Sequence, residues 1–297
     1  MACSFRYYGI FDETDYTKIS FRNGKYDEIE LEKALMLNKR SNLILKHYEK
    51  YNSKSALGFC SSRRQAIYMS KYFNENGIKA CAVISGEQNE FSMDRRVAVD
   101  KLKTGELNII FSVDMFNEGL DIPQIDIILL LRPTESPTIF LQQLGRGLRK
   151  YKDKKYVNVL DFIGNYKKAN LIPFFLSGDL KDSAGKAKLG RLPKEEEYPD
   201  DCIVDFDFQV IDIFKKMMIE QKNIFDLVVE DFNRIKEDLK TRPSRLQMYT
   251  YMDDDFYSVI RSRGELNIFN DYLGFLNKIN ELSIEEKMLL NTKAYEF

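Results

Sequence analysis

Residues Leu141–Lys150 read LQQLGRGLRK, with Arg146 and Arg149 three positions apart and a glycine on either side of Arg146. Positions three and four apart share one face of a helix, so Gln142, Arg146 and Arg149 are expected to point the same way. Guanidinium groups carry a rigid fork of donors that matches phosphate oxygens, and glycine lets a ligand approach the backbone. The stretch therefore predicts a phosphate-binding helix end, or else a solvated basic end that the helix dipole stabilises.

Short apolar runs and longer amphipathic segments alternate around this stretch. The runs are rich in β-branched residues, which is typical of strands buried on both faces, and they span residues 56–60, 79–84, 108–113, 125–131 and 156–162. Helices are expected between them, with glycine or proline at an end, over residues 64–76, 93–104 and 137–150. This order predicts a parallel, doubly wound α/β sheet, in which ligands bind at the carboxyl ends of the strands.

Three loops are expected at that carboxyl edge, at residues 61–63, 114–123 and 132–137. In the middle loop, Gly119 offers a close backbone approach, and the short side chain of Asp121 can accept hydrogen bonds from a sugar diol. The same residues also fit an ordinary Asx turn that ends at Pro123. We expect the three loops to face the same ligand.

The charge and the cysteine content limit which partners, metal sites and cellular compartments are expected. The 297 residues hold 45 basic and 46 acidic side chains, so the chain as a whole has no strong field. Between Arg132 and Lys155, however, seven basic and two acidic residues give a net charge of +5. The four cysteines lack C-x-x-C spacing, which argues against a metal site and favours a reducing compartment. With no signal peptide and no membrane-length apolar run, a cytoplasmic location without membrane contact is expected.

Three segments of the chain resemble a known family. GFCSSRR at 58–64, FSVDMFNEGLDIP at 111–123 and QQLGRGLRK at 142–150 look like motifs IV, V and VI of superfamily 2 DEAD/DEAH-type helicases, in that order. Their spacing is similar to that of the second RecA-like lobe of these motors, over residues 55–170. The nearest look-alikes are bacterial helicases of the restriction, defence and excision-repair types.

The resemblance implies roles for particular residues. Arg146 and Arg149 would act as arginine fingers on the γ-phosphate of ATP, and the same site would include Gly119, Asp121 and Gln142. Single-stranded nucleic acid, with DNA favoured over RNA, would lie across Ser61, Arg63, Ser85, Gly86 and Asp114. One departure is Val113, which stands where the family usually has a threonine that contacts nucleic acid.

A second departure concerns the other half of the ATP site. The sequence has no G-x-x-x-x-G-K-[ST] phosphate loop and no acidic magnesium motif on a strand. ATP and Mg²⁺ would then be bound mainly by an upstream RecA-like lobe, and this chain alone is expected to be an inactive part of a helicase. The rival hypothesis is a non-enzymatic module, derived from a helicase lobe, that binds nucleic acid or protein.

Four regions are expected along the chain. Residues 1–50 would lead from the missing first motor lobe, and residues 51–175 would form the helicase C-terminal lobe, a RecA-like parallel sheet flanked by helices. Residues 176–202 are rich in serine, glycine, lysine and acidic residues, which is typical of a linker. Residues 203–297 show helical periodicity and are expected to form an all-helical accessory domain.

Overall fold

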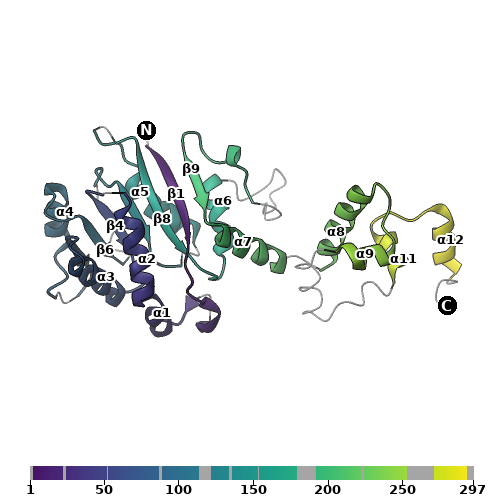
Figure 1. The fold of residues 1–297 in the computed structure, drawn as a ribbon, viewed down its shortest axis with the longest axis horizontal. Helices are drawn as coiled ribbons and strands as arrows, with labels where there is room; N and C mark the ends of the chain where they lie inside the picture. The colour runs from purple at the N-terminus through teal and green to yellow at the C-terminus, as the bar shows by residue number, and fades with distance from the viewer. Residues whose placement is uncertain are drawn as a thin grey trace. The chain divides into compact units, whose positions relative to one another are not determined.

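The computed structural model describes residues 3–22, 25–51, 53–86, 89–113, 122–133, 136–152, 154–178, 192–221, 224–252 and 271–292. Contacts divide the chain into two compact units, Met1–Phe214 and Lys215–Phe297. The first unit is an α/β sandwich and the second is helical among its described residues (Figure 1). Both parts of the predicted fold class, the parallel sheet and the C-terminal helices, are confirmed.

A seven-stranded sheet forms the centre of the first unit, in the order β5-β6-β4-β7-β8-β1-β9. Every pairing in it is parallel. The strands are β1 (Ser4–Phe11), β4 (Ala56–Phe59), β5 (Ala80–Val83), β6 (Ile109–Ser112), β7 (Ile127–Leu130), β8 (Tyr156–Ile163) and β9 (Ile203–Phe206). All residues of β4 to β7 are buried, as the unbroken apolar runs predicted.

Helices cover both faces of this sheet (Figure 1). They are α1 (Glu28–Leu35), α2 (Asn38–Glu49), α3 (Arg63–Glu75), α4 (Arg95–Thr104), α5 (Pro137–Gly147) and α6 (Ile172–Ser177), and α7 (Phe208–Gln221) begins in the same unit. Ile10 of β1 packs in one cluster with Ile44 of α2, whereas Tyr7 contacts Phe140 of α5. Because residues of opposite parity point to opposite faces of a strand, α2 and α5 lie on opposite sides of the sheet.

The last two strands of the sheet, β1 and β9, come from regions that were expected to lie outside the helicase lobe. β1 belongs to residues 1–50, yet it pairs along its whole length with β8, and β9 pairs with β1 although it opens the region expected to be all-helical. A short hairpin, β2 (Phe21–Arg22) and β3 (Lys25–Tyr26), also lies in the first fifty residues. The chain therefore divides into two compact units after Phe214. The four regions expected from the sequence, with boundaries at residues 50, 175 and 202, remain a prediction about function. Residues 179–191 of the expected linker lie outside the described part of the chain.

The second unit contains α8 (Ile224–Leu239), α9 (Arg245–Tyr251), α11 (Tyr272–Lys278) and α12 (Ile284–Thr292) among its described residues. Val228, Phe232 and Ile235 of α8 recur at helical spacing and are buried in one apolar cluster with residues of α9 and α11. A capping box begins α12. Glu286 donates its backbone N–H to the Ser283 hydroxyl over 3.2 Å, and Ser283 donates its own to the Glu286 carboxylate over 2.8 Å.

Candidate functional site

The arginine-bearing helix α5 begins and ends as its local sequence dictates. Ser136 caps its first turn and Pro137 takes the first position, where a missing N–H costs nothing. The helix ends at Gly147, three residues earlier than predicted. The Leu148 carbonyl accepts a 2.7 Å hydrogen bond from the Cys3 backbone N–H at the start of β1, so the chain leaves the helix there.

This helix end corrects the expectation that three side chains share one helical face. Gln142 and Arg146 lie four apart on α5 and both are partly buried. Arg149 lies beyond the helix and is exposed. Its guanidinium is therefore presented from the segment that follows the helix rather than from the helix surface.

Gly145 and Gly147 differ in the space around them. A Cβ at Gly147 would lie 2.6 Å from Val157 Cγ2 and 2.9 Å from Ile128 Cδ1, whereas a Cβ at Gly145 would meet nothing within 4 Å. We expect Gly147→Ala to lower the free energy of unfolding by about 1–3 kcal/mol, because it overpacks the helix against β7 and β8. Gly145→Ala, in open space on a helix, should be neutral or stabilise by about 0.5–1 kcal/mol. Urea unfolding of the two variants checks both expectations. Equal midpoints would contradict the close contact of Gly147 with β7 and β8.

The arginine end of α5 lies at the amino edge of the sheet. Gly147 faces Ile128 and Val157, the second residues of β7 and β8. Ser136, at the other end of the helix, follows the carboxyl end of β7. The helix thus runs back along the sheet, and Arg146 and Arg149 lie at the end opposite to the loops that follow the strands.

Four predicted nucleic-acid contacts lie at the carboxyl edge, after β4 and β5. The Arg63 guanidinium donates to the Ser85 carbonyl over 3.0 Å, and its Nη1 would lie 3.2 Å from a Cβ at Gly86. Gly86 has φ +94°, a conformation that favours glycine. The structure therefore brings Arg63, Ser85 and Gly86 together.

Ser61 is fixed beside this group by a side chain that sequence reasoning did not single out. Its backbone N–H and hydroxyl both donate to Gln65 Oε1, over 2.7 and 2.9 Å. Gln65 is fully buried and donates through Nε2 to the Leu131 carbonyl after β7. Asp114, Gly119 and Asp121, the predicted site residues of the third loop, lie outside the described residues.

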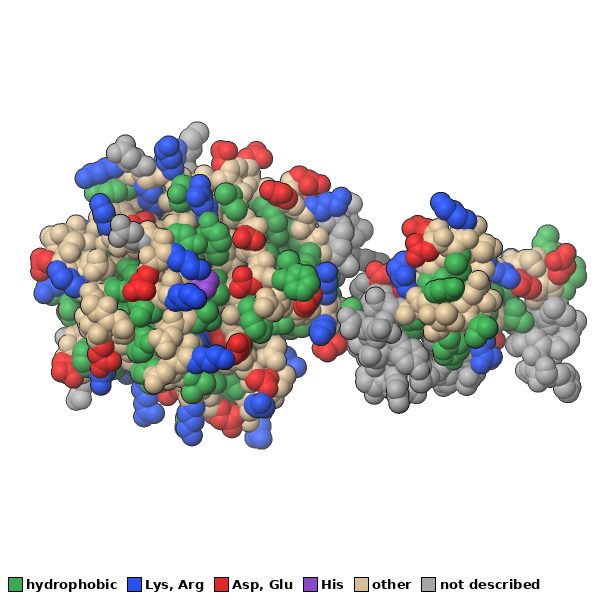
Figure 2. Space-filling view, in the orientation of Figure 1, with side chains coloured by type: hydrophobic (Ala, Val, Ile, Leu, Met, Phe, Trp, Pro, Cys, Tyr) green, Lys and Arg blue, Asp and Glu red, His purple; other side chains and the backbone are tan. Residues whose placement is uncertain are grey.

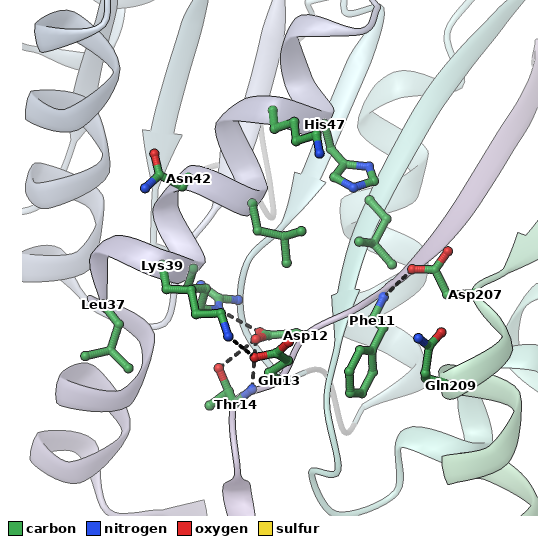
Figure 3. Close-up of a pocket in the computed structure, with 14 residues that line it drawn as sticks. Phe11, Asp12, Glu13, Thr14, Leu37, Lys39, Asn42, His47, Asp207 and Gln209 are labelled. Carbon is green, nitrogen blue, oxygen red and sulfur yellow. Dashed lines mark hydrogen bonds and ion pairs between the residues drawn. The ribbon is translucent and has the colours of Figure 1, made fainter.

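Further along the same edge, a cavity of about 510 Å³ opens where β1 and β9 end (Figure 3). Its floor contains an ion pair that the sequence did not reveal. Arg40 Nε donates to Asp12 Oδ2 over 2.7 Å, and both side chains are 3% exposed. Arg40 also donates to the carbonyls of Leu35 and Leu131, so one guanidinium joins the ends of β1, α1 and β7.

A second buried acid lies on the neighbouring strand β8. Asp161 accepts a hydrogen bond from the Tyr7 hydroxyl, and burial raises the pKa of its carboxyl to about 7. At neutral pH this group is therefore only partly charged, which reduces the cost of burying it next to Asp12. The signal that could have identified Asp161 as a buried acid is its place within the apolar run 156–162, which predicts a strand buried on both faces.

Metal sites and membrane-spanning helices can be assessed over the described residues. No group of three or more His, Cys, Asp or Glu side chains is arranged there to hold a metal ion. No described helix is long and apolar enough to cross a bilayer.

The family comparison agrees with this geometry. The model of the helicase conserved C-terminal domain matches residues 38–151, which include the loops after β4 and β5 and all of α5. These residues are a helicase C-terminal domain. This match agrees with the helicase resemblance of the three motifs.

Curated relatives of the lobe include helicases from distant organisms. IRC3 of Saccharomyces cerevisiae, an ATP-dependent helicase by name, is 30% identical over 166 residues, which cover 54% of this chain and 24% of the yeast protein. A 51.5 kDa protein of a Lactococcus phage is 27% identical over 166 residues, covering 54% of this chain and 35% of its own. The matched part of the chain thus spans about a quarter to a third of these relatives.

Solved structures that are similar to this chain include those of DEAD-box proteins. The C-terminal domain of the DEAD-box protein Dbp5 is 14% identical, with a TM-score of 0.42 over 60% of this chain and 85% of that one. The yeast DEAD-box splicing factor Prp28 is 11% identical, with a TM-score of 0.49 over 72% of this chain and 38% of that one.

Proposed function

We propose that this chain is the second motor lobe of an ATP-dependent nucleic-acid helicase or translocase. The observation that carries the proposal is the separation of two groups of basic side chains on one sheet. Arg63 lies with Ser85 and Gly86 at the carboxyl edge, and Arg146 and Arg149 lie at the amino edge. One rigid lobe can therefore touch a nucleic-acid strand at one end and a nucleotide at the other.

On the nucleotide side, the described residues fit a triphosphate held mainly by another lobe. Arg149 is exposed beyond α5, and a guanidinium there can approach phosphate oxygens that this chain does not itself enclose. Arg146 and Gln142, partly buried on α5, would line the near wall of the site. The phosphate loop and the Mg²⁺ ligands would come from an upstream RecA-like lobe, and ATP supplies the phosphoryl group that is transferred to water.

On the nucleic-acid side, the contacts are those that recognise a backbone. Arg63 supplies a positive charge, Ser61 a hydroxyl, and Gly86 a backbone that a phosphate can approach closely. Phosphate contacts position a strand without reading its bases, so binding should not depend on sequence. We propose single-stranded DNA as the ligand in preference to RNA.

A matched pair of neighbouring arginines tests this assignment. Arg63 points to Ser85, whereas Arg64 is 77% exposed and lies 3.6 Å from Glu32 of α1. We expect Arg63→Ala to weaken binding of a labelled single-stranded oligonucleotide and to reduce the slope of log K against log salt by about 0.7, the value for one lost phosphate contact. Arg64→Ala should change neither quantity appreciably. Titration at several salt concentrations gives both numbers.

If the two variants bind alike, the strand does not lie across Arg63. Tight binding that does not depend on salt would favour the rival hypothesis of a module that recognises bases or protein surfaces.

A further inference from the structure

A second cavity of about 510 Å³ lies at the amino edge of the sheet, where β1 and β8 begin. It is lined by Cys3, Ser4, Lys150, Lys152, Lys154, Lys155 and Asp201. Four lysines thus surround one cavity against a single carboxylate. Most of this lining lies outside the residues that match the helicase domain, which end at 151.

The turn that carries the lysines is built by the protein backbone. The Lys154 backbone N–H donates to the Tyr151 carbonyl over 2.8 Å, and Lys152 between them has φ +40°, in the left-handed region. The Lys154 ammonium donates to the carbonyls of Gly147 and Pro123, the latter over 3.0 Å. Lys154 is therefore fixed to the end of α5, and burial lowers the pKa of its ammonium.

The other three lysines of the cavity differ from Lys154 in their exposure. Lys150, Lys152 and Lys155 are exposed, and none forms an ion pair with another residue of the described ranges. Lys152 lies over the Tyr151 ring at 5.2 Å, so the turn also has one aromatic neighbour. Like charges held this close repel one another, and an anion in the cavity would relieve that repulsion.

We infer that this lysine cavity binds the phosphodiester backbone of nucleic acid, as a second contact apart from Arg63. Ammonium groups are point charges that accept phosphates in any register, whereas tight capture of a free pyrophosphate uses an arginine fork or a helix N-terminus. The lining has no aliphatic or aromatic anchor, so it lacks what a protein interface uses. The inference rests on the proposed function only in requiring that the protein binds nucleic acid.

The position of the cavity predicts how binding depends on length. β8 is eight residues long, and at about 3.3 Å per residue its two ends are roughly 26 Å apart. A strand that contacts Arg63 at the carboxyl edge therefore reaches the lysines only if it continues along the lobe. A 30-nucleotide single strand can do so, and a 3-nucleotide strand held at Arg63 cannot.

The test uses Lys150→Ala/Lys155→Ala in the full chain. The control, Lys33→Ala/Lys103→Ala, makes the same charge change at exposed positions of α1 and α4. For the 30-nucleotide strand we expect the cavity variant to reduce the salt slope by about 1.4, two contacts of about 0.7 each, and the control to leave it unchanged. The 3-nucleotide strand should bind both variants equally, and thermal melting confirms that both are folded.

A cavity variant that binds the 30-nucleotide strand as the control does would overturn the inference. The inference would also be overturned if the lysine substitutions changed only the displacement of the strand by tripolyphosphate. The cavity would then bind free phosphates rather than the nucleic-acid backbone. Arg63→Ala, measured in the same assay, separates the two proposals. If only the lysine variant weakens binding, the result supports the lysine cavity and contradicts the strand site at Arg63. If only Arg63→Ala weakens binding, the result supports the strand site and contradicts the lysine cavity.

Discussion

Replacing Arg149 by alanine is expected to lower nucleic-acid-stimulated ATP turnover by about 10³- to 10⁵-fold in a motor that joins this lobe to a phosphate-loop lobe. The guanidinium would meet charge that develops on the transferred phosphoryl group, so its loss should affect the transition state far more than bound ATP. The affinity for nucleotide should therefore change little. Steady-state kinetics with direct nucleotide titration separates the two quantities.

Two further variants make this result specific. Arg149→Lys should restore little activity, because a point charge cannot reproduce the planar fork. Since Arg149 is exposed, neither change should lower the melting temperature, whereas Arg146 is partly buried and its variants need that check more. A folded Arg149→Ala motor with near-normal ATPase activity would reduce the end of α5 to a basic surface and would leave the second-lobe assignment without its main support.

Replacing Arg40 by alanine is expected to destabilise the first unit by about 3–5 kcal/mol, because it leaves Asp12 as a buried charge without its partner. The same change removes hydrogen bonds to the carbonyls of Leu35 and Leu131, so three elements lose their common donor. Urea unfolding of the full chain, followed by a signal from the sheet-containing unit, measures the effect.

A neighbouring exposed pair provides the control. Lys39 pairs with Glu13 on the rim of the same cavity, and their side chains are 80% and 62% exposed. Lys39→Ala should cost at most about 1 kcal/mol, since exposed ion pairs contribute little. Replacing both members of the buried pair, in Asp12→Leu/Arg40→Met, should cost less than Arg40→Ala alone. Equal effects of Arg40→Ala and Lys39→Ala would contradict the view that Asp12 and Arg40 depend on each other.

Local patterns predicted the central elements of the lobe well. The five apolar runs correspond to β4, β5, β6, β7 and β8 within two residues at each end, because strands buried on both faces need continuous apolar side chains. The three helices between them begin where Ser62, Asp94 and Ser136 cap them. Information of this kind lies within a dozen neighbouring residues and can be read from the sequence.

Contacts between distant residues could not be predicted in this way. β9 is four residues long, and nothing near it indicates that its partner is β1, almost two hundred residues earlier. Helical spacing likewise does not show that Phe208 is 71% exposed, whereas Phe214 of the same helix is buried and contacts Phe206 of β9. The Asp12–Arg40 pair was missed for the same reason, since its two members look like surface residues when each is considered alone.

At the candidate site, the sequence predicted the grouping of the loops better than the end of the helix. Arg63, Ser85 and Gly86 were expected together and lie together, because each follows a strand at the same edge. The arginine helix was expected to continue to Lys150, but the chain leaves it after Gly147 to meet β1. Helical spacing could not reveal that ending, which depends on a strand far away in the sequence.

The position of β1 between β8 and β9 also has a consequence for how the chain acquires its fold during synthesis. Both neighbours of β1 come much later, β8 beginning at Tyr156 and β9 at Ile203. At about 5–20 residues per second, a ribosome needs roughly 8 to 30 s to make the approximately 150 residues between β1 and β8. During that interval Phe5 and Tyr7, both buried in the finished sheet, have no strand beside them. The nascent lobe thus exposes an unpaired apolar strand for seconds, and its yield in a cell should depend on chaperones that shield such segments.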